Sequence, residues 1–165
     1  MTASASEHGP RAVIETAAAA GSPTTRSPGA ALLLVTMLGA PALLRAWLFI
    51  TPNADFTVRG VNVHHLFSGV LLTALAAIPL ALSSGGAVMR RVQVACLGTG
   101  LGLMLDEWVY LVVTDGSNAS YLLPVSAWGA VVLLGLASLY TLCCHLRAAR
   151  QVRRSSIELG DRFAD

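Results

Sequence analysis

The sequence has no lysine and few charged residues of any kind. Charged residues make up 12% of its 165 residues, and the eleven basic residues, all arginine, stand against nine acidic ones. The formal net charge of +2 is too small an excess to indicate a nucleic-acid-binding protein. At 55% hydrophobic residues, the chain is also too apolar for an ordinary soluble domain. The composition favours a membrane protein whose main partner is the lipid bilayer.

Cysteine is scarce as well, and familiar catalytic motifs are missing. The three cysteines include no CxxC pair, which argues against a disulfide framework and against a cysteine zinc site. The sequence has no nucleophile elbow, no phosphate-binding loop and no zinc-protease helix. No residue is therefore assigned a catalytic role from a motif.

The N-terminal segment, residues 1–29, is rich in Ala, Ser, Thr, Gly and Pro. Its longest apolar stretch, residues 17–20, is too short for the core of a signal peptide. We expect residues 1–29 to form a disordered cytoplasmic tail, so that the first hydrophobic segment itself directs insertion.

Four apolar segments follow, at residues 30–50, 61–82, 92–113 and 122–144. Each is close to the ~20 residues that a helix needs to cross ~30 Å of hydrocarbon. The separators are short, so neighbouring helices should run antiparallel. The sequence predicts an all-α fold, with an integral membrane four-helix bundle over residues 30–145 and a basic cytoplasmic tail at residues 146–165.

The placement of arginine predicts the orientation in the membrane. Arginines precede the first segment, join the second to the third and follow the fourth: Arg11, Arg26, Arg90, Arg91, Arg147, Arg150, Arg153 and Arg154. The opposite loops hold a single arginine, Arg59. The positive-inside rule then predicts a multi-pass protein of a prokaryotic plasma membrane with both termini cytoplasmic. Trp108, Tyr110 and Tyr121, near the outer ends of their segments, fit an aromatic interface belt.

The strongest functional signal is a set of ionisable residues inside the predicted spans: Arg45, His64, His65, Asp106 and Glu107. A charge at the bilayer centre costs roughly 2.5 to 3.5 kcal/mol on insertion scales, so these groups need compensation. Antiparallel threading places all five near one face, because the first segment ends, the second begins and the third ends on the same side. We expect them to form a polar cluster near the outer face.

Imidazole and carboxylate groups together are the ligands that zinc and iron sites use. The sequence therefore offers His65, Asp106 and Glu107 as candidate ligands of a divalent metal, Zn or Fe. Consecutive residues on a helix point about 100° apart. We therefore expect one member of the pair His64–His65 and one of the pair Asp106–Glu107 to face inward, with a slight preference for His65.

Small residues indicate which way the third segment packs. Gly98 and Gly102 are four residues apart, and Asp106 continues the same helical face. This pattern predicts close packing against a neighbouring helix, toward which Asp106 should point.

A structural alternative accounts for much of the same pattern. Arg45 can pair with Asp106 or Glu107 as a buried salt bridge, while a histidine bonds the remaining acceptor. Such a clasp would hold the bundle together, but it leaves the excess of two histidines and a second carboxylate unexplained.

Two strings carry a resemblance to other proteins: HHLFSG at residues 64–69 and GLGLMLDEWVYL at residues 100–111. They resemble the paired motifs, two histidines followed by a glycine and later a Leu-Asp-Glu, of small uncharacterised multi-pass membrane proteins of bacteria and archaea. The resemblance covers the middle of the chain. It supports the choice of the two histidines and two carboxylates and implies no activity.

Two classes of function follow from the sequence. The first is a non-enzymatic role, as an accessory subunit or a small ion- or proton-handling protein whose cluster clasps the bundle or relays protons. The second is a membrane-embedded metal-dependent enzyme acting on a lipid or lipid-linked substrate, with a carboxylate as general base. The missing catalytic motifs favour the first class. A homo-oligomer or a larger membrane complex is compatible with either.

Overall fold

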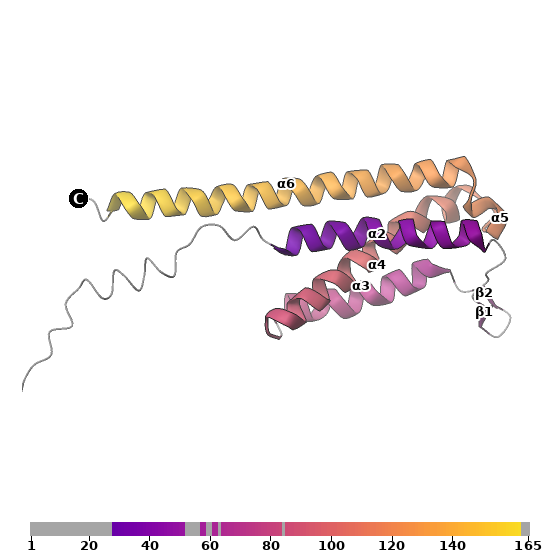
Figure 1. Ribbon diagram of the computed structural model, residues 1–165, viewed down its shortest axis with the longest axis horizontal. Coiled ribbons are helices and arrows are strands. Elements are labelled where there is room, and N and C mark those ends of the chain that lie inside the picture. The colour runs from indigo at the N-terminus through magenta and orange to yellow at the C-terminus, as the bar shows by residue number, and fades with distance from the viewer. Residues whose placement is uncertain (1–27, 52–56, 59–60, 63, 84, 163–165) are drawn as a thin grey trace, which may run out of the picture.

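The computed structural model describes residues 28–51, 57–58, 61–62, 64–83 and 85–162 (Figure 1). The tail predicted at residues 1–29 lies outside this part of the chain, apart from Pro28 and Gly29, which begin the first described helix. Arg59 also lies outside it.

Four long helices form the body of the described chain: α2 (Pro28–Ile50), α3 (His65–Ala81), α4 (Ala87–Val113) and α6 (Pro124–Arg162). The short elements among the described residues are β1 (Thr57–Val58), β2 (Val61–Asn62) and the helix α5 (Asn118–Tyr121). The two strands pair with each other in an antiparallel ladder. The predicted all-α fold with four long helices is confirmed.

Three of the described helices are long and apolar enough to cross a membrane: Gly29–Ile50, Ala87–Val113 and Pro124–Ile157. The helix α3 is also apolar, but its 17 residues span about 26 Å at ~1.5 Å per residue, slightly less than ~30 Å of hydrocarbon. Large hydrophobic side chains are exposed along the helices, among them Phe49 (80% exposed), Leu75 (62%) and Trp128 (68%). An apolar surface of this extent is suited to lipid rather than to water.

The helices differ from the predicted spans at their ends. The helix α3 begins at His65 rather than at residue 61, because residues 61–62 pair in β2 and His64 is extended, with φ −63° and ψ 140°. The helix α4 begins at Ala87, before the predicted span. Polar residues can continue a helix, but a hydropathy pattern does not count them as part of an apolar span. The helix α6 begins at Pro124, whose fixed backbone angle φ suits the first turn of a helix. It runs unbroken past residue 145 to Arg162. Its C-terminal part projects beyond the other helices (Figure 1).

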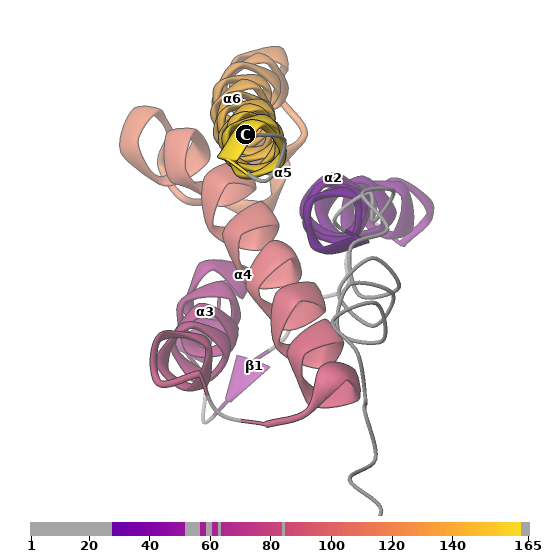
Figure 2. The same cartoon turned by 90° about the vertical axis from the view of Figure 1, so that its left-hand side faces the viewer.

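The helix α4 is the centre of the packing. It contacts α2, α3 and α6, and Figure 2 shows it running between α3 on one side and α2 and α6 on the other. Within the described residues, α3 packs against no other long helix, whereas α2 and α6 also touch each other. The arrangement is therefore a hub with three partners rather than a closed ring of four helices.

Glycines on two faces of α4 permit this close packing. A Cβ atom at Gly98 or Gly102 would collide with backbone carbonyl oxygens of α2. On the opposite face, a Cβ atom at Gly100 would lie 2.7 Å from the carbonyl oxygen of Gly69 in α3. The stripe of Gly98 and Gly102 thus packs on α2, while Gly100 lets α3 approach from the other side.

Candidate functional site

The five ionisable residues of the predicted cluster meet near the C-terminal end of α4. Asp106 and Glu107 lie in the last two turns of this helix, and each is only 1% exposed. Arg45 reaches Asp106 from α2, while His64 precedes α3 and His65 begins it. Two buried carboxylates need compensating donors or cations, and these residues supply them.

Asp106 and Glu107 face different helices although they are neighbours in sequence. Asp106 pairs with Arg45 of α2, and Glu107 contacts His64 and Leu66 at the start of α3. The expectation that only one of the two carboxylates faces inward is wrong. The reason is that α4 has a partner on either side, so residues about 100° apart can both be buried.

The Asp106 carboxylate is held by a cation and a hydroxyl. Arg45 Nε donates to Oδ1 at 2.7 Å, and the Tyr121 hydroxyl donates to Oδ2. The other guanidinium nitrogens donate to Ser126 Oγ at 3.2 Å and to the Tyr121 carbonyl oxygen at 3.4 Å. Arg45 Cζ also lies 4.5 Å from the centroid of the Tyr121 ring, a cation–π distance. The guanidinium is therefore fixed by partners on α4, α5 and α6.

The Glu107 carboxylate caps α3 from a neighbouring helix. Its Oε2 accepts a hydrogen bond from the backbone N–H of Leu66 at 2.5 Å, and its Oε1 lies 2.8 Å from His64 Nδ1. No side chain at the N-cap position of α3 supplies a hydrogen bond, so Glu107 satisfies an N–H group that the first turn leaves free. The extended backbone at His64 allows both histidine rings to reach the carboxylates, a departure from the predicted preference for one of them.

The His65 ring lies between the two acids. Its Nε2 is 3.3 Å from the Tyr121 hydroxyl and 3.6 Å from Asp106 Oδ2, and its Nδ1 is 3.5 Å from Glu107 Oε2. The Tyr121 hydroxyl donates its hydrogen to Asp106, so its oxygen can only accept a hydrogen bond from Nε2 of His65. This pattern assigns a hydrogen to Nε2 and leaves Nδ1 of the neutral ring as an acceptor facing Glu107.

Two tyrosines belong to the site, although their positions in the sequence predict an aromatic interface belt. Tyr110 is 1% exposed and Tyr121 4%. Their rings meet edge to face at a centroid distance of 5.2 Å, and they also pack against His64 and His65. A signal for Tyr110 exists in the sequence, because it lies three residues after Glu107 and so shares its helical face. Tyr121 lies in a separate short helix, which no periodicity connects to the cluster.

A hydroxyl-rich turn places α5, and with it Tyr121, against the cluster. Asp115 Oδ1 accepts hydrogen bonds from the Ser117 N–H at 3.0 Å and from the Ser117 and Ser120 hydroxyls at 2.8 Å each. The Ser117 N–H, followed by the two hydroxyls, holds the pKa of Asp115 below its usual value. At the end of α5, burial and the nearby Asp106 charge raise the pKa of the Tyr121 hydroxyl well above 10. Tyr121 therefore stays protonated and remains a donor.

The geometry does not favour the metal-ligand hypothesis. Among the described residues, no group of three or more His, Cys, Asp or Glu side chains could hold a metal ion. His65 turns Nε2 toward Asp106 and Nδ1 toward Glu107. A histidine binds a metal ion through only one of its ring nitrogens, so the two acids do not share a metal-binding side of this ring. Asp106 and Glu107 also already accept from Arg45 and from the start of α3.

Comparison with known proteins finds no match to the chain among family models, curated protein sequences or solved structures.

Proposed function

We propose that this chain is a non-enzymatic, proton-handling membrane protein whose cluster takes up one proton between His65 and Glu107. The observation that carries the proposal is the 3.5 Å separation between His65 Nδ1 and Glu107 Oε2. With a neutral ring and an ionised carboxylate, both atoms are acceptors. A proton shared between them would turn an acceptor–acceptor contact into a charge-assisted hydrogen bond.

The charge balance of the cluster supports the same conclusion. Asp106 and Glu107 are both buried. Arg45 is the one permanent cation of the cluster, and it pairs with Asp106. The cluster is therefore one positive charge short of neutrality until a histidine or a carboxylate binds a proton. A buried charge excess is costly, so a proton bound in the cluster would serve as the missing counter-ion.

The cluster is partly exposed through its cationic and imidazole side chains. The side chains of Arg45, His64 and His65 are between 20% and 23% exposed, which lets protons exchange at this end. The sequence between Arg91 and Asp106 contains no histidine, acidic or basic residue that could continue a relay along α4. These features support uptake and release of a proton at one face, as in a proton-responsive accessory subunit, rather than conduction across the membrane.

The proposal includes an orientation. Arg90 and Arg91 lie at the start of α4, and the cluster lies near its C-terminal end. The positive-inside rule then puts the cluster at the outer face of the plasma membrane, with both termini cytoplasmic. The two motifs at residues 64–69 and 100–111, which resemble those of other small membrane proteins, contact each other through His64 and Glu107. This contact supports treating them as one functional unit.

Proton uptake by the purified full-length protein, free of a His-tag, tests the proposal. The pH dependence of histidine NMR signals and of carboxylate infrared bands should reveal one coupled protonation event in the original protein. His65→Ala and Glu107→Gln should each abolish it. His145→Ala is the matched control, because His145 lies on α6 outside the cluster and its removal should leave the coupled event unchanged.

Two results would refute the proposal. One is a carboxylate band that titrates identically in the original protein and in His65→Ala. The other is a stoichiometric metal ion, found by elemental analysis and lost with His65, which would support the metal-dependent class instead.

A further inference from the structure

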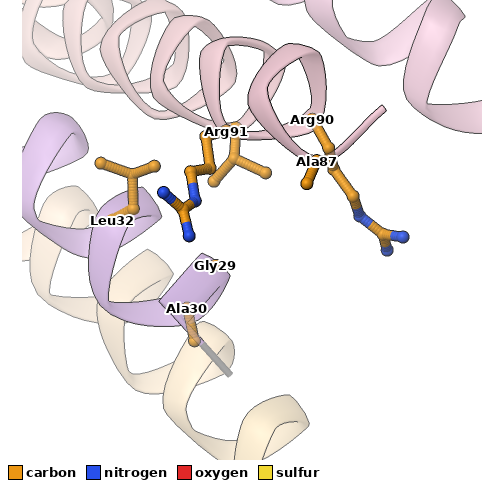
Figure 3. A pocket seen from close by; sticks show the side chains of 7 residues that line it. Gly29, Ala30, Leu32, Ala87, Arg90 and Arg91 are labelled. Atoms are coloured by element: carbon orange, nitrogen blue, oxygen red, sulfur yellow. The ribbon is translucent and has the colours of Figure 1, made fainter. Parts of the chain in front are cut away.

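A second polar feature lies at the other end of α4, far from the cluster. A cleft of about 370 Å³ opens between the first turns of α2 and the first turns of α4. Its lining combines small and apolar residues with two arginines: Gly29, Ala30, Leu32, Ala87, Arg90, Arg91 and Val94 (Figure 3). The proposed proton site uses none of these residues.

The two arginines have no counter-ion in the described part of the chain. Neither Arg90 nor Arg91 makes an ion pair or a side-chain hydrogen bond there, whereas Arg45 has both. The described acidic side chains lie at or beyond the far end of α4: Asp106, Glu107 and Asp115. As far as the described side chains go, the cleft therefore presents positive charge without a counter-ion.

The two guanidinium groups have different positions at the cleft. In Figure 3, Arg91 extends into the space between α4 and the first turn of α2, near Leu32 and Gly29. Arg90 turns the other way and also borders a smaller cavity of about 70 Å³ beside Ser83 and the end of α3. Arg91 is therefore the main positive group in the cleft, and Arg90 adds charge at its rim.

The cleft changes from charged to apolar with depth along the helices. Gly29 and Ala87 mark the start of two candidate spans, at the level where lipid headgroups lie. Leu32 and Val94 line the same cleft about one to two turns further into the spans. A phosphate beside the arginines and an acyl chain along the apolar part match this gradient.

We infer that the cleft binds an anionic phospholipid, with Arg91 as the principal contact to the headgroup phosphate and Arg90 as a second positive charge. Charge complementarity selects an anion, and the apolar depth selects a lipid over a free ion. The lipid would bridge α2 and α4 at their N-terminal ends and stabilise their contact there.

Native mass spectrometry of the full-length protein in detergent, titrated with phosphatidylglycerol or phosphatidylcholine, tests this inference. The original protein should retain phosphatidylglycerol preferentially. Arg91→Gln should weaken the apparent affinity for phosphatidylglycerol about fivefold, the effect of one basic residue near an anionic surface. Arg90→Gln should weaken it less, and Arg91→Lys should largely restore it.

The matched control is Arg153→Gln, which removes the same charge from an exposed position on α6. Its affinity for phosphatidylglycerol should equal that of the original protein, and an equal loss in both variants would mean that only net charge matters. Competition by millimolar inorganic phosphate would show a free-anion site and overturn the lipid assignment. Equal retention of both lipids would overturn the inference as well.

Discussion

The ion pair between Arg45 and Asp106 gives the most direct test of what holds the helices together. We expect Arg45→Met, which keeps the apolar part of the side chain, to lower the free energy of unfolding by about 3 kcal/mol. Breaking a buried ion pair costs about 3 to 5 kcal/mol. We use the lower end of this range because the Arg45 side chain is 20% exposed. Water can therefore reach part of the space that the side chain leaves and can solvate Asp106.

The size of the effect follows from what the substitution leaves behind. Asp106 would keep the Tyr121 hydroxyl as a donor but would lose its permanent cation while 1% exposed. Ser126 and the Tyr121 carbonyl oxygen would each lose a donor as well. The double variant Arg45→Met/Asp106→Asn removes both charges. It should recover at least half of the loss, because an unpaired buried charge costs more than a missing neutral hydrogen bond.

Unfolding by sodium dodecyl sulfate in mixed micelles, followed by circular dichroism, measures these differences. Arg153→Gln, which changes an exposed arginine of α6, should shift the unfolding free energy by less than about 0.5 kcal/mol. The reasoning fails if Arg45→Met is as stable as the original protein. It also fails if the double variant is no more stable than Arg45→Met.

Three further outcomes are expected. In thermal unfolding, Gly102→Ala should destabilise the protein by about 1 to 3 kcal/mol, because the new Cβ atom meets a backbone carbonyl of α2. Gly135→Ala is the control: its Cβ atom meets nothing within 4 Å, so this variant should be as stable as the original protein or more stable. Hydrogen bonds from Ser117 lower the pKa of Asp115 from 3.8, so Asp115→Asn should reduce stability at neutral pH. This difference should fade as the pH falls through the folded pKa, because the bonded carboxylate then becomes protonated. With native cysteines removed, Ser117→Cys on intact cells should react with an impermeant thiol reagent and Gly86→Cys should not, and the reverse labelling would show that the cluster faces the cytoplasm.

The positions of the helices could be predicted from hydropathy, but their ends and partners could not. A hydropathy pattern locates apolar stretches, so it misses the start of α4 at Ala87 and the continuation of α6 to Arg162. It also extends α3 back to residue 61, since Val61 is apolar whether it lies in a strand or in a helix. Gly98 and Gly102 predict one close helix partner for α4. They do not predict the second partner, which packs on glycine at the opposite face.

The site was predictable where partners share a helical face and not where they come from turns. The stripe that leads from Gly102 to Asp106 indicates a partner on a neighbouring helix, and the structure places Arg45 there. The bond from His64 to Glu107 depends on an extended backbone just before α3, which a continuous predicted span conceals. Tyr121 reaches the cluster only because a turn folded around Asp115 positions α5.

The hub arrangement also has a consequence for biogenesis. Arg45 and its partner on α4 are 61 residues apart in the chain, and α2 and α3 do not pack against each other in the described part of the protein. At about 5 to 20 residues per second, α2 leaves the ribosome roughly 3 to 12 s before that partner is synthesised. During this interval the nascent chain lacks both the carboxylate that pairs with Arg45 and the carboxylate that caps α3. We therefore expect α2 and α3 to reach their final positions only after α4 has been made, because each of them packs on α4.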